Sequence, residues 1–311
     1  FRRGFVWGND DTDLVSPTVL FSEKADPLPS PPKQVLTDPE TQLALSRHSN
    51  FIKIQTPYDV DKLSTLLLLH PNRPFVESVL NGLKHGFWPC HSGEWKDKSE
   101  FFDNYPLQPP DEDALKLYRD KEVEAGRWSP PISKLSPGMK LSPMFVVWQG
   151  ETNKARVVTD QSASGLNDGV SKEDAHVRYD DMHSFGAALR QAKLRHPGRK
   201  LILFKDDVKG AFPTLPAHPA WQLKQVVTVN SALHIVRVMV FGGRAIPRTW
   251  CAFASLILWI LVRKLDIVSL HMYMDDFFGW DFDDNCAFFR SRLRPKRQIQ
   301  LLIFWEYINC P

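Results

Sequence analysis

The sequence predicts an α/β (α+β) protein in which an antiparallel sheet is backed by helices. Three observations lead to this fold class. Short β-branched and aromatic runs are paired across turn-forming residues, as in antiparallel hairpins. Other segments carry apolar residues at helical spacing. Finally, 43% of the 311 residues are hydrophobic, which is enough to bury a core.

Composition sets only loose limits on function. The net charge of +3 and the pI near 8.6 permit a nucleic-acid partner without requiring one. The four cysteines show no paired spacing, which favours reduced thiols and an intracellular location, cytoplasm or nucleus. His85, Cys90 and His91 lie close together, but no second pair follows at zinc-site spacing, so we expect no metal there.

No signal peptide and no membrane span are expected. The longest apolar run, Cys251 to Val262, is shorter than the roughly 20 residues that a span needs, and Arg248 and Arg263 flank it. We therefore interpret this run as a buried helix and expect no membrane partner.

The N-terminal part divides into two regions. Residues 1–58 are rich in Pro, Ser and acidic residues, and we expect them to be poorly ordered. Residues 59–126 are helical in pattern: two short helices within 59–87, separated by a break at 70–72, precede a charged helix within 106–127.

Strand patterns begin after a Pro-rich connection. Within 127–200, Met144 to Gln149 and Lys154 to Thr159 form a predicted hairpin, and a helix follows at about 182–194. Within 201–311, residues 201–204 are predicted to form a fully buried strand. Residues 225–229 and 234–240 are predicted to form a second hairpin. A helix from Pro247 and a strand at 267–274 follow.

Adjacent acids stand between apolar residues in Tyr273-Met274-Asp275-Asp276. A buried carboxylate pair repels itself unless cations neutralise it, so a turn of this kind suggests a divalent metal site. The alternative is an ordinary solvated hairpin turn, in which Asp is common.

A second pair of acids, Asp206 and Asp207, follows the strand at 201–204. Two strands can thus present acids side by side. Three carboxylates on two Mg²⁺ ions roughly 4 Å apart would activate a 3′-hydroxyl and stabilise a pentavalent phosphate. That arrangement is typical of nucleotidyl transfer.

These residues resemble the reverse transcriptases. The Tyr-Met-Asp-Asp box (YMDD motif) resembles their catalytic turn, and Asp207-Val208-Lys209-Gly210-Ala211-Phe212 is similar to their first catalytic strand. In that register Asp207, not Asp206, is the ligand. Further blocks stand in the family's order at 142–147, 154–160 with 166–167, and 241–247. The resemblance covers about residues 115–311 and is strongest to retroelement (retrotransposon) enzymes of the tyrosine-recombinase or long-terminal-repeat kind.

The resemblance implies a right-hand polymerase fold and specific residue roles. It implies an RNA-directed DNA polymerase that binds two Mg²⁺ ions, or Mn²⁺ in their place, a template, a primer and deoxynucleoside triphosphates. The implied catalytic residues and metal ligands are Asp207, Asp275 and Asp276, with Val208 as a backbone ligand. The implied nucleotide-binding residues are Lys154, Arg156, Phe212 as a steric gate against ribose, and Gly242. Tyr273, Met274 and Arg244 are implied to face primer and template.

Each role has a plainer alternative. Lys154 and Arg156 lie two residues apart on one strand face and can reach the same phosphates or simply face solvent. Phe212, Tyr273 and Met274 can be packing residues. Two runs of basic residues can bind nucleic-acid phosphates or simply face solvent. The first run is Arg190, Lys193, Arg195, Arg199 and Lys200, and the second is Arg290, Arg292, Arg294, Lys296 and Arg297.

The resemblance assigns residues 127–200 to the fingers and residues 201–311 to the palm, which includes a fingers hairpin near 225–240. The helical region 59–126 leads into the fingers. The chain stops within what resembles the fourth palm block, so we expect a thumb to be absent. A catalytically silent remnant that at most binds nucleic acid is the main rival. An RNA-templated RNA polymerase is a third reading, against which Tyr273-Met274 and Phe212 speak.

Overall fold

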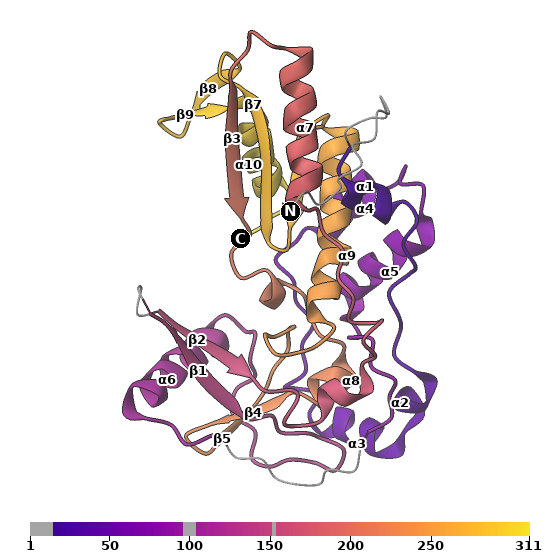
Figure 1. Ribbon diagram of the computed structural model, residues 1–311. Helices are drawn as coiled ribbons and strands as arrows, with labels where there is room; N and C mark the ends of the chain where they lie inside the picture. Colours follow the sequence, from indigo (N-terminus) through magenta and orange to yellow (C-terminus); the bar gives the residue numbers. More distant parts are fainter. Residues whose placement is uncertain (1–14, 96–103, 151–153) are drawn as a thin grey trace, which may run out of the picture.

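The computed structural model describes residues 15–95, 104–150 and 154–311 (Figure 1). Over these ranges the chain is a mixed α/β protein with small antiparallel sheets and packed helices, as the sequence predicts.

The largest sheet among the described residues has three antiparallel strands. These are β3 (Leu201–Asp207), β7 (Asp276–Phe282) and β6 (His271–Tyr273), in the order β3-β7-β6. The register pairs Leu201 with Phe282 at one end of the sheet and Asp207 with Asp276 at the other. Tyr273 also pairs with Asp276, which leaves a turn of two residues between β6 and β7.

Helices cover both faces of this sheet (Figure 1). On one face, α7 (Met182–Arg195) packs Phe185 against Phe278, with ring centroids 4.9 Å apart. On the other, α10 (Lys296–Tyr307) packs Trp305 against Phe277, also at 4.9 Å. The neighbouring side chains of β7 point to opposite faces, as the two-residue period of a strand requires.

The prediction of a fully buried strand at 201–204 is wrong. Only Phe204 is buried, at 7% exposure, whereas Leu203 is 59% exposed. The reason is that α7 covers only part of its face of the sheet, so the β3 edge of that face stays open.

The helix α9 (Ile246–Trp259) continues as a π-helical turn through Ile260–Lys264. Pro247 lies in its first turn, as expected. The 19-residue stretch is long and apolar enough to cross a membrane by length and composition alone, but 83% of its 18-residue apolar window is buried inside the fold. The prediction of a buried helix at 251–262 is confirmed.

A second group of elements surrounds Trp128, which is fully buried. It contains α6 (Pro109–Glu124), the hairpin β1–β2 (Met144–Gln149 and Lys154–Thr159) and the hairpin β4–β5 (Val226–Val229 and Ala232–Ile235). The bounds of the first hairpin are as predicted; its turn residues 151–153 lie outside the described residues. The second hairpin is shorter than predicted, because 236 and 238 make single bridges to Trp128 and Pro216.

Residues 15–58 are ordered, so the expectation of poor order over 1–58 is wrong there; residues 1–14 lie outside the described residues. The segment forms α1 (Pro17–Ser22), α2 (Lys33–Thr37) and α3 (Pro39–Arg47). Side-chain caps and prolines in the first turns hold α1 and α3, Pro32 precedes α2, and α1 packs on α9. The Pro-rich composition therefore marks helix starts rather than disorder.

The remaining elements follow the predictions with some differences. The two helices expected within 59–87 are α4 (Val60–Leu66) and α5 (Arg73–His85), and α7 matches the helix expected at 182–194. The strand expected at 267–274 is shorter than predicted and comprises only β6, because residues 267–270 form a turn after α9. Short helices at Leu166–Gly169, Phe212–Thr214 and α8 (Pro219–Gln222), and the hairpin β8–β9 (Cys286–Phe289 and Arg292–Pro295), complete the described chain.

Candidate functional site

Two acidic segments far apart in sequence meet at one end of the β3-β7-β6 sheet. Asp207, the last residue of β3, lies directly opposite Asp276, the first residue of β7. Residues paired in this way have Cα atoms about 4.5–5.5 Å apart and side chains on the same face. The Val208 N–H also donates a hydrogen bond to the Asp275 carbonyl oxygen at 3.0 Å. The expectation that two strands place these acids side by side is therefore confirmed for the main chain.

The turn that carries Asp275 is held in an unusual conformation. Met274 has φ of +54°, in the left-handed region that non-glycine residues rarely occupy. The Trp250 indole N–H of α9 donates to the Met274 carbonyl oxygen at 2.9 Å, and the Met274 side chain packs on the core beside Cys251. Helix α9 thus fixes the position of the Asp275 main chain.

The charges at this end of the sheet are concentrated. Burial raises the pKa of Asp275, and the negative charges of Asp207 and Asp276 raise it further. The Lys205 ammonium lies 2.7 Å from an Asp276 carboxylate oxygen. That hydrogen bond raises the pKa of Lys205, with smaller contributions from the charges of Asp276, Asp207 and Asp275. A positive charge therefore partly neutralises a group of three carboxylates.

The oxygen atoms at this end of the sheet are of the chemical types that bind a divalent cation. Asp207 and Asp275 interact electrostatically as like charges, and the main chain of Val208 lies beside Asp275. Carboxylate and carbonyl oxygens are ligands that Mg²⁺ and Mn²⁺ accept. Within 15–95, 104–150 and 154–311, however, no three acidic, His or Cys side chains are already grouped closely enough to hold a metal. The side chain of Asp276 is instead engaged with Lys205.

Asp206 faces away from this group. It pairs with Phe277, on the face covered by α10, and its Oδ1 accepts a hydrogen bond from the Gln298 amide at 3.3 Å. Its Oδ2 is buried with no partner among the described residues, and burial raises the pKa of Asp206. Alternation along β3 thus puts Asp207, and not Asp206, on the face of Asp276.

Lys154 and Arg156 are exposed at alternate positions of β2, opposite Gln149 and Val147 of β1. They share a strand face, as predicted. Their hairpin lies in the lower half of Figure 1 and packs on α6, whereas the acids are at the lower end of β3 in the upper half. No contact described in the structure joins these two cations to the carboxylates.

Gly242 lies where the main chain passes close to β2. Its φ is +116°, and a Cβ atom there would lie 1.8 Å from the Thr159 carbonyl oxygen. Next to it, the Arg244 N–H donates to the Asn167 side chain at 2.7 Å, and its guanidinium donates to the Val170 carbonyl oxygen at 2.9 Å. Gly242 and Arg244 therefore join three segments of the chain.

Phe212 is 8% exposed and packs against the exposed Phe241, with ring centroids 4.8 Å apart. It belongs to the core beneath the end of β3. Tyr273, in contrast, is 48% exposed and contacts the Tyr179 ring at 4.4 Å. A cavity of about 600 Å³ opens beside it, lined by Leu203, Phe278, Asp276 and residues at the start of α7.

Two site residues were not identified from the sequence. Lys205 stands two positions before Asp207, and the strand period alone could have placed both on one face. Asp180 is 1% exposed; its carboxylate accepts hydrogen bonds from the Ser16 hydroxyl at 2.6 Å and from the Thr18 and Met272 N–H groups at 3.0 Å each. It anchors β6 to the N-terminal segment, and no local pattern indicates this.

Comparison with known proteins adds no identification. No protein-family model matches the chain, and no curated protein matches it.

Proposed function

We propose that this chain is the fingers and palm of a reverse transcriptase of retroelement origin, an RNA-directed DNA polymerase that extends a primer 3′-hydroxyl by two-metal-ion nucleotidyl transfer. The observation that carries the proposal is the pairing of Asp207 with Asp276, with Asp275 in the intervening turn. A three-stranded antiparallel sheet with acids at one end and helices behind it is the arrangement that the sequence resemblance calls for. The ordered motifs support the same assignment.

In this proposal the acids hold two Mg²⁺ ions, which Mn²⁺ can replace. The bound ions would lower the pKa of the primer hydroxyl and neutralise charge on the transferred phosphate. Asp207 and Asp275 are the principal ligands, with the Val208 carbonyl and Asp276 in support. Because the Lys205 ammonium contacts Asp276, it must move or share that carboxylate when an ion enters.

The other residues bind and position the substrates. Lys154 and Arg156 offer a point charge and a bidentate guanidinium to the triphosphate of a deoxynucleotide. In this proposal the exposed ring of Tyr273 and the backbone at Met274, Gly242 and Arg244 contact the primer and an RNA or DNA template. Phe212 excludes a ribose 2′-hydroxyl only if its small exposed edge borders the sugar. The site of action is intracellular.

The test is primer extension on a poly-rA template with an oligo-dT primer and Mg²⁺ or Mn²⁺. We expect template-dependent incorporation by the full chain and its loss, by at least about 10³-fold, in Asp275→Asn. The control is Asp283→Asn, an exposed acid beyond the end of β7, which should retain activity. Incorporation that persists in Asp275→Asn would refute the assignment.

A catalytically silent remnant is the alternative, and one observation favours it: Asp276 is already paired with Lys205. The two readings differ in metal binding. The polymerase requires Mn²⁺ uptake that weakens in Asp207→Asn, whereas a remnant that only binds nucleic acid would retain salt-sensitive RNA binding without it.

A further inference from the structure

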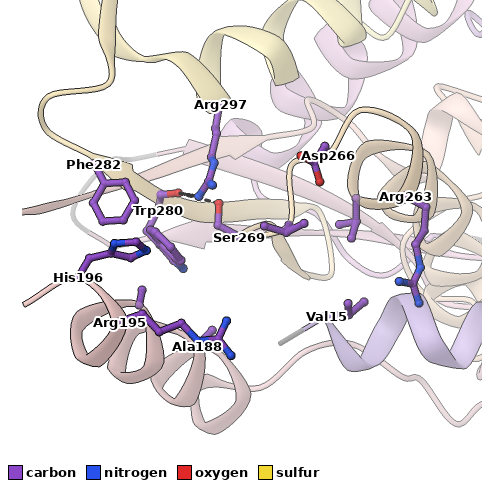
Figure 2. Close-up of a pocket in the computed structure, with 13 residues that line it drawn as sticks. Val15, Ala188, Arg195, His196, Arg263, Asp266, Ser269, Trp280, Phe282 and Arg297 are labelled. Carbon is purple, nitrogen blue, oxygen red and sulfur yellow. Dashed lines mark hydrogen bonds between the residues drawn. The ribbon is translucent and has the colours of Figure 1, made fainter. Parts of the chain in front are cut away.

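A cavity of about 440 Å³ lies at the end of the sheet opposite the acids. Its walls come from the end of α7, the end of the α9 helix with the loop after it, β7, the start of α10, and Val15, which precedes α1. Figure 2 shows Arg195 and Arg297 on opposite sides of Trp280, with Arg263 further along the cavity. Elements distant in sequence therefore build one site, of a size that suits a small organic ligand.

The polar lining of this cavity is dominated by hydrogen-bond donors. Three arginines, Arg195, Arg263 and Arg297, face a single acid, Asp266. Arg263 donates through Nε to Glu23 at 3.2 Å, and Arg297 lies 3.9 Å from Asp281 and donates to the Trp280 carbonyl oxygen at 3.3 Å. Each of these two guanidinium groups keeps further N–H donors.

Arg195 differs from the other two arginines, because it is exposed and lies at the C-terminal end of α7, with no described carboxylate within ion-pair distance. Beside it, His196 adds a ring nitrogen to the lining and packs edge-on against Phe282, with centroids 5.1 Å apart. The charge that is least neutralised thus lies at the α7 side.

The Trp280 indole N–H supplies independent evidence for a ligand. Trp280 is 92% buried, and its Nε1 has no hydrogen-bond partner among the described residues. A buried donor without an acceptor is costly, and native proteins rarely leave one unpaired. In Figure 2 the ring nitrogen lies on the side facing Arg195, where an anionic oxygen could accept from both groups.

Apart from Ser269, whose hydroxyl donates to the Trp280 carbonyl oxygen at 2.6 Å, the rest of the lining is apolar. The rings of Trp280 and Phe282 and the aliphatic side chains of Ala188, Ala192, Val262 and Val268 form a wall beside the cationic groups. A ligand that satisfies both parts has a phosphate at one end and a planar, weakly polar group at the other. We propose that this cavity binds a nucleotide-like ligand, its phosphate held by Arg195 and the Trp280 N–H and its ring against Trp280 and Phe282.

This site is distinct from the candidate catalytic site. Phe282 and Asp276 are at opposite ends of β7, which separates the two sites by roughly 20 Å at about 3.3 Å per residue. The inference therefore holds or fails independently of the polymerase assignment.

The test is calorimetric titration of the full chain with AMP, in EDTA so that no divalent ion is present. We expect saturable binding, weaker binding of inorganic phosphate, and a loss of AMP affinity of at least about tenfold in both Arg195→Ala and Trp280→Phe. Trp280→Phe keeps a ring and removes the N–H; Arg195→Ala alters an exposed side chain, so it tests the site even if the first variant is poorly folded. Asp275→Asn should leave AMP affinity unchanged, which separates this cavity from the catalytic site.

The matched control is Arg292→Ala, an exposed arginine on β9 outside the cavity. An equal loss of affinity in this variant would show non-specific attraction and overturn the proposal. Adenosine that binds as tightly as AMP would overturn it as well, because the phosphate would then play no part. Val15 lines the cavity, and Asp10, Asp11 and Asp13 precede it in the sequence. The titration is therefore repeated with these three acids changed to Asn, and the absence of AMP binding in both forms would also refute the site.

Discussion

The role of an acidic residue in this chain depends on which face of its strand it occupies. Asp206 and Asp207 are adjacent and chemically identical, yet Asp206 lies under α10 and Asp207 faces Asp276. A shift of one residue in the β3 register would exchange them and bury the acid that the site needs. The identity of the useful acid is thus a property of the register and not of the residue type.

Gly242→Ala tests a position where the backbone leaves no room. The new Cβ would lie 1.8 Å from the Thr159 carbonyl oxygen, at a φ of +116° that L side chains rarely adopt. We expect a loss of about 2–4 kcal/mol in the free energy of unfolding, measured by urea denaturation. Gly198→Ala, where a Cβ would meet nothing within 4 Å, is the control. A neutral Gly242→Ala would mean that the loop can shift away from β2.

Some of this residue-level detail could be predicted from the sequence. The choice of Asp207 follows from strand alternation once the register is known. The Lys205–Asp276 ion pair does not follow in the same way, because a flexible lysine on the same face can equally point to solvent. The burial of Phe212 depends on Phe241, which is 29 positions away and contacts it only after folding.

At the scale of elements, the hairpin β6–β7 depends on α9. Its two-residue turn has a positive φ at Met274, and the Trp250 N–H holds the Met274 carbonyl oxygen. The buried Met272 of β6 belongs to the same apolar core as the helix. A long buried helix therefore acts as the support against which the acidic turn is set.

Trp250→Phe removes this hydrogen bond and keeps an aromatic ring. We expect a destabilisation of roughly 1–3 kcal/mol, because the Met274 carbonyl oxygen loses a donor in a partly buried place and a smaller ring leaves space. The same variant should increase hydrogen exchange at the β6–β7 turn. Trp305→Phe on α10, which has no indole hydrogen bond to this turn, is the control. If exchange at the turn is the same in both variants, α9 does not hold it.

Elements with strong periodicity were predictable, and those set by tertiary contacts were not. The bounds of β1 and β2 match the predicted ones because alternation and turn residues both mark them. Helices α1 to α3 escaped prediction because each is short. Their stability depends on side-chain caps in α1 and α3 and on packing, as where α1 meets α9. β6 was predicted too long because residues 267–270, three of which are apolar, form a turn after α9.

At the scale of the whole molecule, one buried histidine, His91, and one partly buried histidine, His218, make stability depend on pH. His91 stacks on Trp95 and accepts a hydrogen bond from the Gly93 N–H, and His218 packs beside Trp88. Burial lowers the pKa of each to about 4; nearby Lys140 and Lys224 contribute for His91, and His85 for His218. Their folded-state pKa values are thus depressed below the unfolded value of 6.5.

The sign of the effect follows from proton binding. Below pH 6.5 the unfolded chain takes up protons that the folded chain refuses, so stability falls as the pH drops towards about 4 and the loss levels off below it. The loss is up to roughly 3 kcal/mol per histidine. We expect His91→Gln to have a flatter dependence of unfolding free energy on pH between 7 and 4.5, measured with urea. The exposed His176→Gln is the control, and equal slopes in the two variants would contradict the prediction.

The pairing of Asp207 with Asp276 also determines when the acidic site can form. The two residues are 69 positions apart, and the intervening chain includes α8, the β4–β5 hairpin and the whole of α9. A loop of this length must close before either acid meets the other. On the ribosome, the acids therefore meet only after β7 has emerged, and a proteolytic cut within the connection before that point would leave the two acids on separate polypeptides.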